Sequence, residues 1–268
     1  MTNIRTLASA GLTAATAAAL LLFVPLPAGA QGPTLIKHAV FEGTGDGAHE
    51  ISTEDLEKVL AGNSATLLDA RPHEEFAMGH IPGAVNVAPK AGVAMSMYVS
   101  DVAEIVRLLK GNKATALVLY CNGPHCGKSK RLATELRDAG YANVSRYQLG
   151  LPVWRALGGL VQIEREGITH VLANDRTAVV VDVREAADFK GGSLRQAVNI
   201  PRSLVVDAKD MGEVRRAKDD GRLPMNDHNT RIIVVGADAA AARHVAGRIA
   251  LEAFSNVTYY AGSISELR

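Results

Sequence analysis

The chain has 268 residues, of which 47% are hydrophobic, 21% charged and 4% aromatic. This composition excludes collagen-like, coiled-coil and wholly disordered proteins, and the length predicts about two domains, each with its own core. Because 29 basic residues nearly balance 28 acidic ones, there is no basic excess to attract a nucleic-acid backbone. Two cysteines are too few for a disulfide scaffold, so their role must be local.

Residues 1–30 have the pattern of a secretory signal peptide. A single charge, Arg5, precedes an apolar run from Ala14 to Val24, and small residues follow at Ala28-Gly29-Ala30, where a signal peptidase requires them. Two prolines end the run short of the ~20 apolar residues of a membrane span, so cleavage before Gln31 is favoured over an uncleaved anchor. We therefore expect a periplasmic or secreted protein, away from the membrane after cleavage and in an oxidising compartment.

The following part of the chain alternates predicted helices and strands. Ser52-Thr53 favour a helix start and Gly62 a helix end, whereas short apolar runs favour strands. In chain order we expect a helix at 54–60, strands at 65–69 and 84–87, a helix capped by Asp101 and ending at Lys110, a strand at 116–120 and a helix at 129–139. Alternation of this kind is typical of α/β folds, in which helices flank a mostly parallel sheet in three layers.

The chain also contains an internal repeat. Residues 67–87 align without a gap with residues 180–200, and seven of the 21 positions are identical. The identical pairs are Asp69/Asp182, Arg71/Arg184, Phe76/Phe189, Gly79/Gly192, Ala84/Ala197, Val85/Val198 and Asn86/Asn199. We therefore predict two tandem copies of one unit, an N-terminal domain at 31–163 and a C-terminal domain at 164–268.

A cysteine follows the predicted strand at 116–120, where parallel sheets bind ligands. The loop reads Cys121-Asn122-Gly123-Pro124-His125-Cys126-Gly127-Lys128-Ser129 and leads directly into a predicted helix. Backbone N–H groups of such a loop favour an anion at the sulfur, and Lys128 adds positive charge. A free thiol with a pKa of ~8.5 is mostly protonated at pH 7, so a sulfur nucleophile needs this environment. The alternative interpretation is a buried, inert cysteine.

The repeat and the loop together resemble the rhodanese (sulfurtransferase) family. The segment from Asp69 to Asn86 contains D-x-R followed by E-x-F-x-x-G-H-I-P-G-A-x-N, and a strand-end cysteine follows at Cys121. Residues 147–160 resemble the closing segment of the family, with Trp154 in the expected place. The resemblance covers essentially the whole mature chain. It implies two rhodanese-like domains in tandem, each an α/β unit of three layers with a mostly parallel sheet.

The resemblance also implies a reaction. Cys121 would be the catalytic residue, taking the outer sulfur of a small anionic donor such as thiosulfate as a persulfide and passing it to a thiol or a cyanide-like acceptor. Asp69 and Arg71 would support the site. The substrate-binding loop would consist of Asn122, Gly123, His125, Cys126, Gly127, Lys128 and Ser129. No cofactor, metal or nucleic acid is implied, and no partner protein is indicated.

Two features depart from the family pattern. Ser129 follows Cys121 by eight residues where the family has six, and the second repeat keeps six, from Gly236 to Ala242. The insertion adds Cys126, which either fills the wider loop or acts as a resolving cysteine that attacks the persulfide and closes a disulfide. The C-terminal repeat has Gly236 in place of the cysteine, so we expect it to be inactive and structural.

Other functions remain open alternatives. A thiol-disulfide redox protein could use Cys121 and Cys126, and a phosphatase would require an arginine where Lys128 stands. The chain could also be a non-catalytic accessory module of an exported pathway. A structural zinc site is not expected, because Cys121, His125 and Cys126 have no second ligand pair nearby in sequence.

Overall fold

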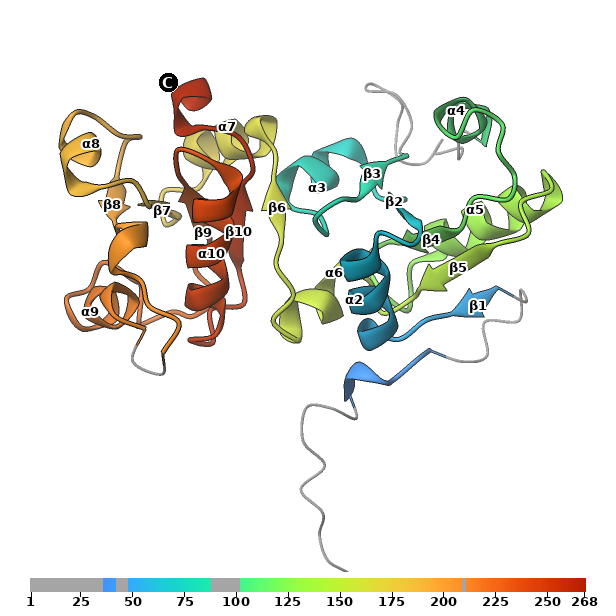
Figure 1. The fold of residues 1–268 in the computed structure, drawn as a ribbon, viewed down its shortest axis with the longest axis horizontal. Coiled ribbons are helices and arrows are strands. Elements are labelled where there is room, and N and C mark those ends of the chain that lie inside the picture. Colours follow the sequence, from blue (N-terminus) through green and yellow to red (C-terminus); the bar gives the residue numbers. More distant parts are fainter. Residues whose placement is uncertain (1–35, 42–47, 88–101, 209–210) are drawn as a thin grey trace, which may run out of the picture. The chain divides into compact units, whose positions relative to one another are not determined.

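The computed structural model describes residues 36–41, 48–87, 102–208 and 211–268 (Figure 1). The predicted signal peptide at 1–30 and the predicted helix cap Asp101 lie outside these residues. Within them, no helix has the length and apolar character required to cross a membrane.

The first repeat forms a parallel sheet of five strands in the order β1-β5-β4-β2-β3. These strands are β1 (His49–Glu50), β2 (Thr66–Asp69), β3 (Val85–Asn86), β4 (Leu117–Tyr120) and β5 (Val144–Tyr147). The helices are α2 (Thr53–Gly62), α3 (His73–Met78), α4 (Val102–Leu108), α5 (Gly127–Asp138) and α6 (Gly150–Ala156).

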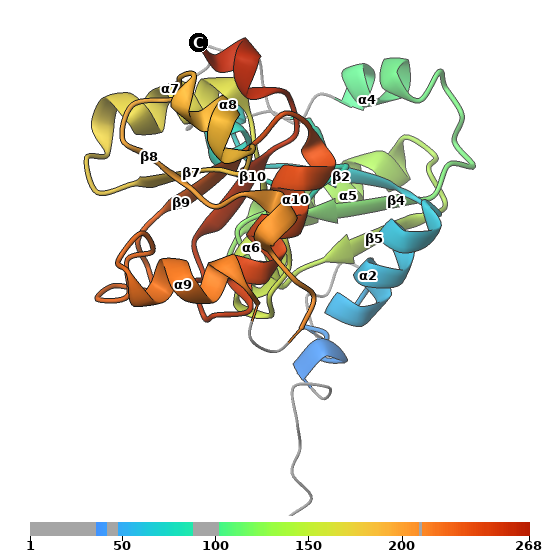
Figure 2. The same cartoon turned by 60° about the vertical axis from the view of Figure 1, so that its left-hand side comes forward.

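Figure 2 shows the elements of the first repeat from a second direction. Side-chain alternation along β4 explains why helices pack on both faces of this sheet. Because successive strand residues point to opposite faces, Val118 packs in one core cluster with Leu56 of α2 and Trp154 of α6. Leu119 packs in the other, with residues of α4 and α5. Both faces of the sheet are therefore covered, and all four residues of β4 are buried, as in other parallel sheets.

The second repeat forms an equivalent parallel sheet in the order β6-β10-β9-β7-β8. Its strands are β6 (Gln162–Ile163), β7 (Val179–Asp182), β8 (Ala197–Asn199), β9 (Ile232–Val235) and β10 (Val257–Tyr260). Its α-helices are α7 (Arg165–Asn174), α8 (Ala186–Lys190), α9 (Glu213–Asp219) and α10 (Ala239–Ala250). Each strand has its counterpart in the same place of the first sheet, so the predicted tandem α/β architecture is confirmed.

Helix boundaries differ from the sequence-based expectations by one or two residues. Helix α5 begins at Gly127 rather than at 129, because Cys126 is the extended residue that precedes the first helical turn. Helix α4 ends at Leu108 rather than at Lys110, which has a positive φ of 52° and so belongs to the turn. The sequence analysis did not predict α3 and α6.

A buried ion pair connects the carboxyl ends of β2, β3 and β4. Arg71 Nε donates to Asp69 Oδ1 at 2.9 Å, and the Arg71 guanidinium also donates to the carbonyl oxygen of Gly79 at 2.8 Å. The hydroxyl of Tyr120 donates to Asp69, and the Asn86 amide donates to the backbone oxygen of Arg71 at 2.9 Å. The D-x-R motif therefore has a structural role beside the loop, and its supporting role in a reaction stays a prediction.

Candidate active site

Cys121 lies directly after β4 at the carboxyl edge of the sheet. Its side chain continues the alternation of β4 and belongs to the same core cluster as Leu119, on the α5 side. Only 1% of the residue is exposed. The Cys121 Sγ donates to the carbonyl oxygen of Cys126 at 3.4 Å and lies 3.3 Å from Ser129 Oγ, in the first turn of α5. The carbonyl oxygen of Cys126 and the hydroxyl of Ser129 therefore both lie against this sulfur.

A glycine of α6 holds the loop from the other side. Gly150 has a φ of +67°, and a Cβ atom there would lie 2.4 Å from both the carbonyl oxygen of Cys121 and the amide nitrogen of Gly123. The next residue, Leu151, donates its N–H to the Cys121 carbonyl at 3.1 Å. Only glycine allows this close approach of two backbone segments, so α6 fixes the position of the cysteine.

Gln148 is a loop-organising residue that the sequence analysis missed. Its side-chain amide donates to the carbonyl oxygens of Gly123 at 3.3 Å and Pro124 at 3.0 Å, while its Oε1 accepts from Ser129 Oγ at 3.3 Å. The residue is only 3% exposed. Because Gln148 follows β5 at the same sheet edge as Cys121, the rule that sites lie beyond the carboxyl ends of parallel strands could have found it.

The hydrogen bond between the two thiols shifts their pKa values in opposite directions. Hydrogen bonding with the Cys126 side chain and then burial raise the pKa of Cys121 above its ordinary range. The hydrogen bond from Cys121, together with the backbone N–H groups of Asn122 and Lys128 and the Lys128 charge, lowers the pKa of Cys126 to about 6. The sequence predicts the anion at Cys121, whereas this geometry favours it at Cys126, which is more exposed and directly faces the N–H donors.

The other predicted loop residues lie in different surroundings. The Asn122 amide donates to Glu75, His125 is exposed, and Gly127 is the first residue of α5. Lys128 is half-buried in the first turn of that helix, where its charge acts on Cys126. No cluster of three or more metal-binding side chains exists among the described residues. The site is therefore a thiol pair at a helix start.

The second repeat has an equivalent loop that is two residues shorter and has no cysteine. Ile264 donates its N–H to the carbonyl oxygen of Gly236 at 2.8 Å, in the way that Leu151 donates to Cys121. The carboxylate of Asp238 accepts from the N–H of Ala241 at 2.9 Å and caps α10. A negative charge of the chain itself therefore occupies the start of the helix that is equivalent to α5.

Both repeats match known proteins. A model of the rhodanese-like domain matches residues 52–157 and 169–268. The thiosulfate:glutathione sulfurtransferase of Homo sapiens is 32% identical over 113 residues, covering 40% of this chain and 94% of that protein. An HTH-type transcriptional regulator of Mycobacterium tuberculosis is 32% identical over 108 residues, covering 40% of this chain and 42% of the regulator, so the chain spans less than half of that relative's length.

A solved structure, the thiosulfate sulfurtransferase of Pseudomonas aeruginosa, is 21% identical, covers 80% of this chain and 41% of that chain, and has a TM-score of 0.35. The two segments matched by the domain model correspond to the two parallel sheets and together exceed half of the chain. The chain belongs to the rhodanese-like domain family and contains two copies of the domain.

Proposed function

We propose that the protein is a sulfurtransferase that carries a sulfur atom as a persulfide on Cys121. The observation that supports this most is the position of Cys121, buried at the carboxyl edge of the sheet beneath the first turn of α5. The human relative named as a thiosulfate:glutathione sulfurtransferase matches over 94% of its own length, which favours a small anionic sulfur donor and a thiophilic acceptor. The N-terminal pattern favours a periplasmic or secreted location.

In the first step, the sulfur of Cys121 attacks the outer sulfur of thiosulfate. A new S–S bond forms on Cys121, the S–S bond of thiosulfate breaks, and sulfite leaves with the bonding electron pair. As this bond forms, the Cys121 thiol gives up its proton to the Cys126 thiolate, which accepts a hydrogen bond from it in the resting site. The N–H groups at the start of α5 then stabilise the persulfide anion.

In the second step, the persulfide gives its outer sulfur to an acceptor. A thiolate or cyanide attacks that sulfur, the S–S bond to Cys121 breaks, and Cys121 leaves as a thiolate that is reprotonated from Cys126. No external oxidant or reductant is required. If Cys126 instead attacked the inner sulfur, sulfide would leave and a Cys121–Cys126 disulfide would form; this is the resolving role and the basis of the redox alternative.

The direct test is the mass of the reduced mature protein after incubation with thiosulfate. We expect a gain of one sulfur, ~32 Da, at Cys121, because this strand-end cysteine lies beneath the first turn of α5 with the Cys126 thiolate beside it as a base. Peptide mapping by mass spectrometry identifies the modified residue. Sulfur found at Cys126 in protein that retains Cys121, or no gain with any common donor, would overturn the assignment. A loss of ~2 Da instead marks the disulfide of the redox alternative.

The pH profile should follow Cys126. Its thiolate accepts the Cys121 proton, and because its pKa is lowered to about 6, the thiolate is present above that pH and lost below it. We therefore expect kcat/KM for thiosulfate to rise through about pH 6 and to be level at neutrality. In Cys126→Ser this rise should move to higher pH. An unchanged profile in that variant would show that another group controls the proton.

Lys128→Ala should slow sulfur transfer from thiosulfate by roughly 10- to 100-fold. The donor is an anion, and Lys128 supplies positive charge at the first turn of α5, where it acts on Cys126. Steady-state kinetics measure the effect, and thermal unfolding should be unchanged because the side chain is half-buried at most. Lys130→Ala, two residues further along the helix and exposed, is the matched control.

A further inference from the structure

The sulfur of Cys121 is covered by protein. Cys121 is 1% exposed, and its Sγ lies 3.4 Å from the carbonyl oxygen of Cys126 and 3.3 Å from Ser129 Oγ. Sulfur transfer from thiosulfate requires direct contact between two sulfur atoms, because a new S–S bond forms between them. A donor molecule therefore reaches Cys121 only after a part of the chain moves aside.

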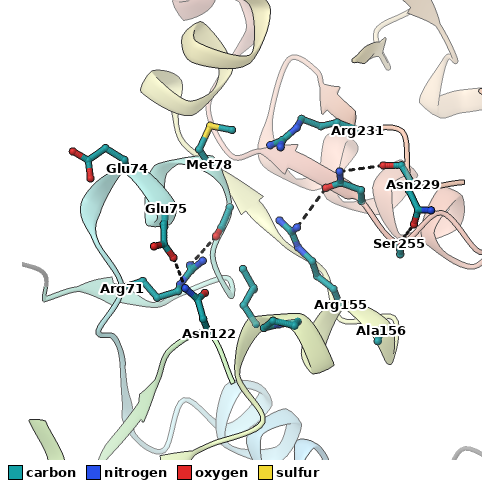
Figure 3. A pocket seen from close by; sticks show the side chains of 14 residues that line it. Arg71, Glu74, Glu75, Met78, Asn122, Arg155, Ala156, Asn229, Arg231 and Ser255 are labelled. Carbon is teal, nitrogen blue, oxygen red and sulfur yellow. Dashed lines mark hydrogen bonds between the residues drawn. The ribbon is translucent and has the colours of Figure 1, made fainter. Parts of the chain in front are cut away.

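The cover over this sulfur consists of residues 122–126, which we call the strap. Asn122 and His125 of the strap are exposed, and Asn122 lies at the edge of a cavity of about 700 Å³ (Figure 3). On the opposite side of the strap, the carbonyl oxygen of Cys126 accepts from the Cys121 thiol. The strap thus lies between the sulfur and the solvent, in the loop that is two residues longer than its counterpart in the second repeat.

The side chain of Gln148 holds the strap in place. Gln148 is 3% exposed, and its Nε2 lies 3.0 Å from the carbonyl oxygen of Pro124, 3.3 Å from that of Gly123 and 3.5 Å from that of Cys126. The two N–H groups of one amide are therefore shared among three backbone oxygens of the strap. Because these hydrogen bonds are shielded from water, they stabilise the closed strap more than exposed bonds would.

The strap also has an internal turn, which does not depend on Gln148. The N–H of Cys126 donates to the carbonyl oxygen of Gly123 at 2.9 Å, and Gly123 has a φ of +105°, a conformation that favours glycine. This turn can persist while the strap moves as a unit. The Asn122 amide donates to Glu75 on the exposed side (Figure 3). The buried bonds that opening must break are therefore mainly those of Gln148.

We propose that Gln148 is a positioning residue that holds the strap closed over Cys121, and that release of the strap admits the sulfur donor. This inference rests on the proposed function for the nature of the donor. Gln148 contacts neither the sulfur nor the donor and acts through the strap. Transfer then uses two positions of the strap, an open one in which the donor enters and a closed one in which the loop N–H groups stabilise the persulfide.

Alkylation with iodoacetamide measures access to Cys121 without any sulfur transfer. In Cys126→Ser, Cys121 is the sole thiol, and the bonds of Gln148 to backbone oxygens remain. Adding Gln148→Met removes the amide at similar volume and should make Cys121 react about 10-fold faster or more. Each rate is divided by the thiolate fraction, measured by ultraviolet absorbance, so that a change in acidity is not mistaken for access. Gln162→Met, which removes a partly buried amide that donates to Glu164, is the matched control.

A second variant separates the strap bonds from the contact with Ser129. Ser129 Oγ donates to Gln148 Oε1 at 3.3 Å. Gln148→Glu keeps an acceptor for this hydroxyl, but a carboxylate has no N–H to donate to the strap. It should therefore accelerate alkylation of Cys121 as Gln148→Met does. Acceleration in Gln148→Met alone, or in neither variant, would refute the role of Gln148 in holding the strap.

Sulfur-transfer kinetics in the Cys126-containing protein provide an independent test. In Gln148→Met, KM for thiosulfate should fall about 10-fold, because a larger fraction of the protein is open to the donor, and kcat should fall because the closed position is less populated. A purely structural role would lower kcat without lowering KM. If alkylation accelerates but Cys121 never gains sulfur, the persulfide proposal fails and the strap stands. If sulfur is transferred but the alkylation rate is unchanged, the strap proposal fails alone.

Discussion

Cys121→Ser protein should transfer sulfur from thiosulfate at least about 10³-fold more slowly than the wild type, a loss of roughly 4 kcal/mol of transition-state stabilisation. A serine hydroxyl cannot hold sulfur as a persulfide, so the two-step reaction has no intermediate. The assay is formation of thiocyanate from thiosulfate and cyanide. The fold should survive, because a serine Oγ can donate to the Cys126 carbonyl oxygen that the thiol now uses.

The control is Cys126→Ser. It should retain the persulfide on Cys121 in a longer-lived form, and air oxidation should no longer produce an intramolecular disulfide. The comparison of the two variants also tests whether Cys126 is the nucleophile, because Cys126 is the more exposed thiol and the one whose pKa is lowered. If Cys126→Ser abolished transfer while Cys121→Ser retained it, the nucleophile would be Cys126 and the buried thiol its proton partner.

Asp69→Ala should lower the free energy of unfolding by about 3–5 kcal/mol, because it leaves the buried Arg71 charge without its partner. The Asp69 and Arg71 side chains are 0% and 4% exposed, and the Tyr120 hydroxyl would lose its acceptor as well. Denaturant unfolding monitored by circular dichroism measures the change. The pair links β2 to the start of the Cys121 loop. We therefore expect the rate of sulfur transfer in Asp69→Ala to fall together with the free energy of unfolding.

Asp182→Ala is the matched control in the second repeat. The Asp182–Arg184 pair has a similar geometry, but the Arg184 side chain is 13% exposed. Water can therefore solvate the Arg184 charge better once the Asp182 carboxylate is removed. We expect a smaller destabilisation and little direct effect on Cys121. A loss below about 1 kcal/mol in Asp69→Ala, typical of exposed ion pairs, would contradict the structural role assigned to Asp69.

Most of the architecture could be predicted because it depends on patterns that are local in the sequence. Alternating apolar runs and helix-ending glycines indicated the α/β layers, and the repeat at identical Asp, Arg and Asn positions indicated two equivalent sheets. Helices α3 and α6 were missed because six or seven residues make fewer than two helical turns, which is too short to show a helical periodicity. Their position depends on tertiary contacts, as the packing of Gly150 against the loop shows.

The loop itself was predicted from its residues, but its electrostatics were not. Spacing alone cannot show which thiol faces the N–H groups of Asn122 and Lys128, and the structure favours Cys126. The contribution of Gln148 requires knowing that β5 lies beside β4.

The contrast between Asp238 and Cys126 has a thermodynamic consequence. Helix α10 begins with a carboxylate that accepts a backbone N–H, whereas α5 begins at Cys126 with no side-chain cap hydrogen bond. At neutral pH the Cys126 thiolate gives the first turn of α5 the negative charge that Asp238 gives α10. Protonation of Cys126 and folding of the first domain are then linked equilibria. Because the pKa of Cys126 is lower in the folded chain, this stabilisation is complete above the ordinary thiol pKa and is lost as the pH falls through about 6.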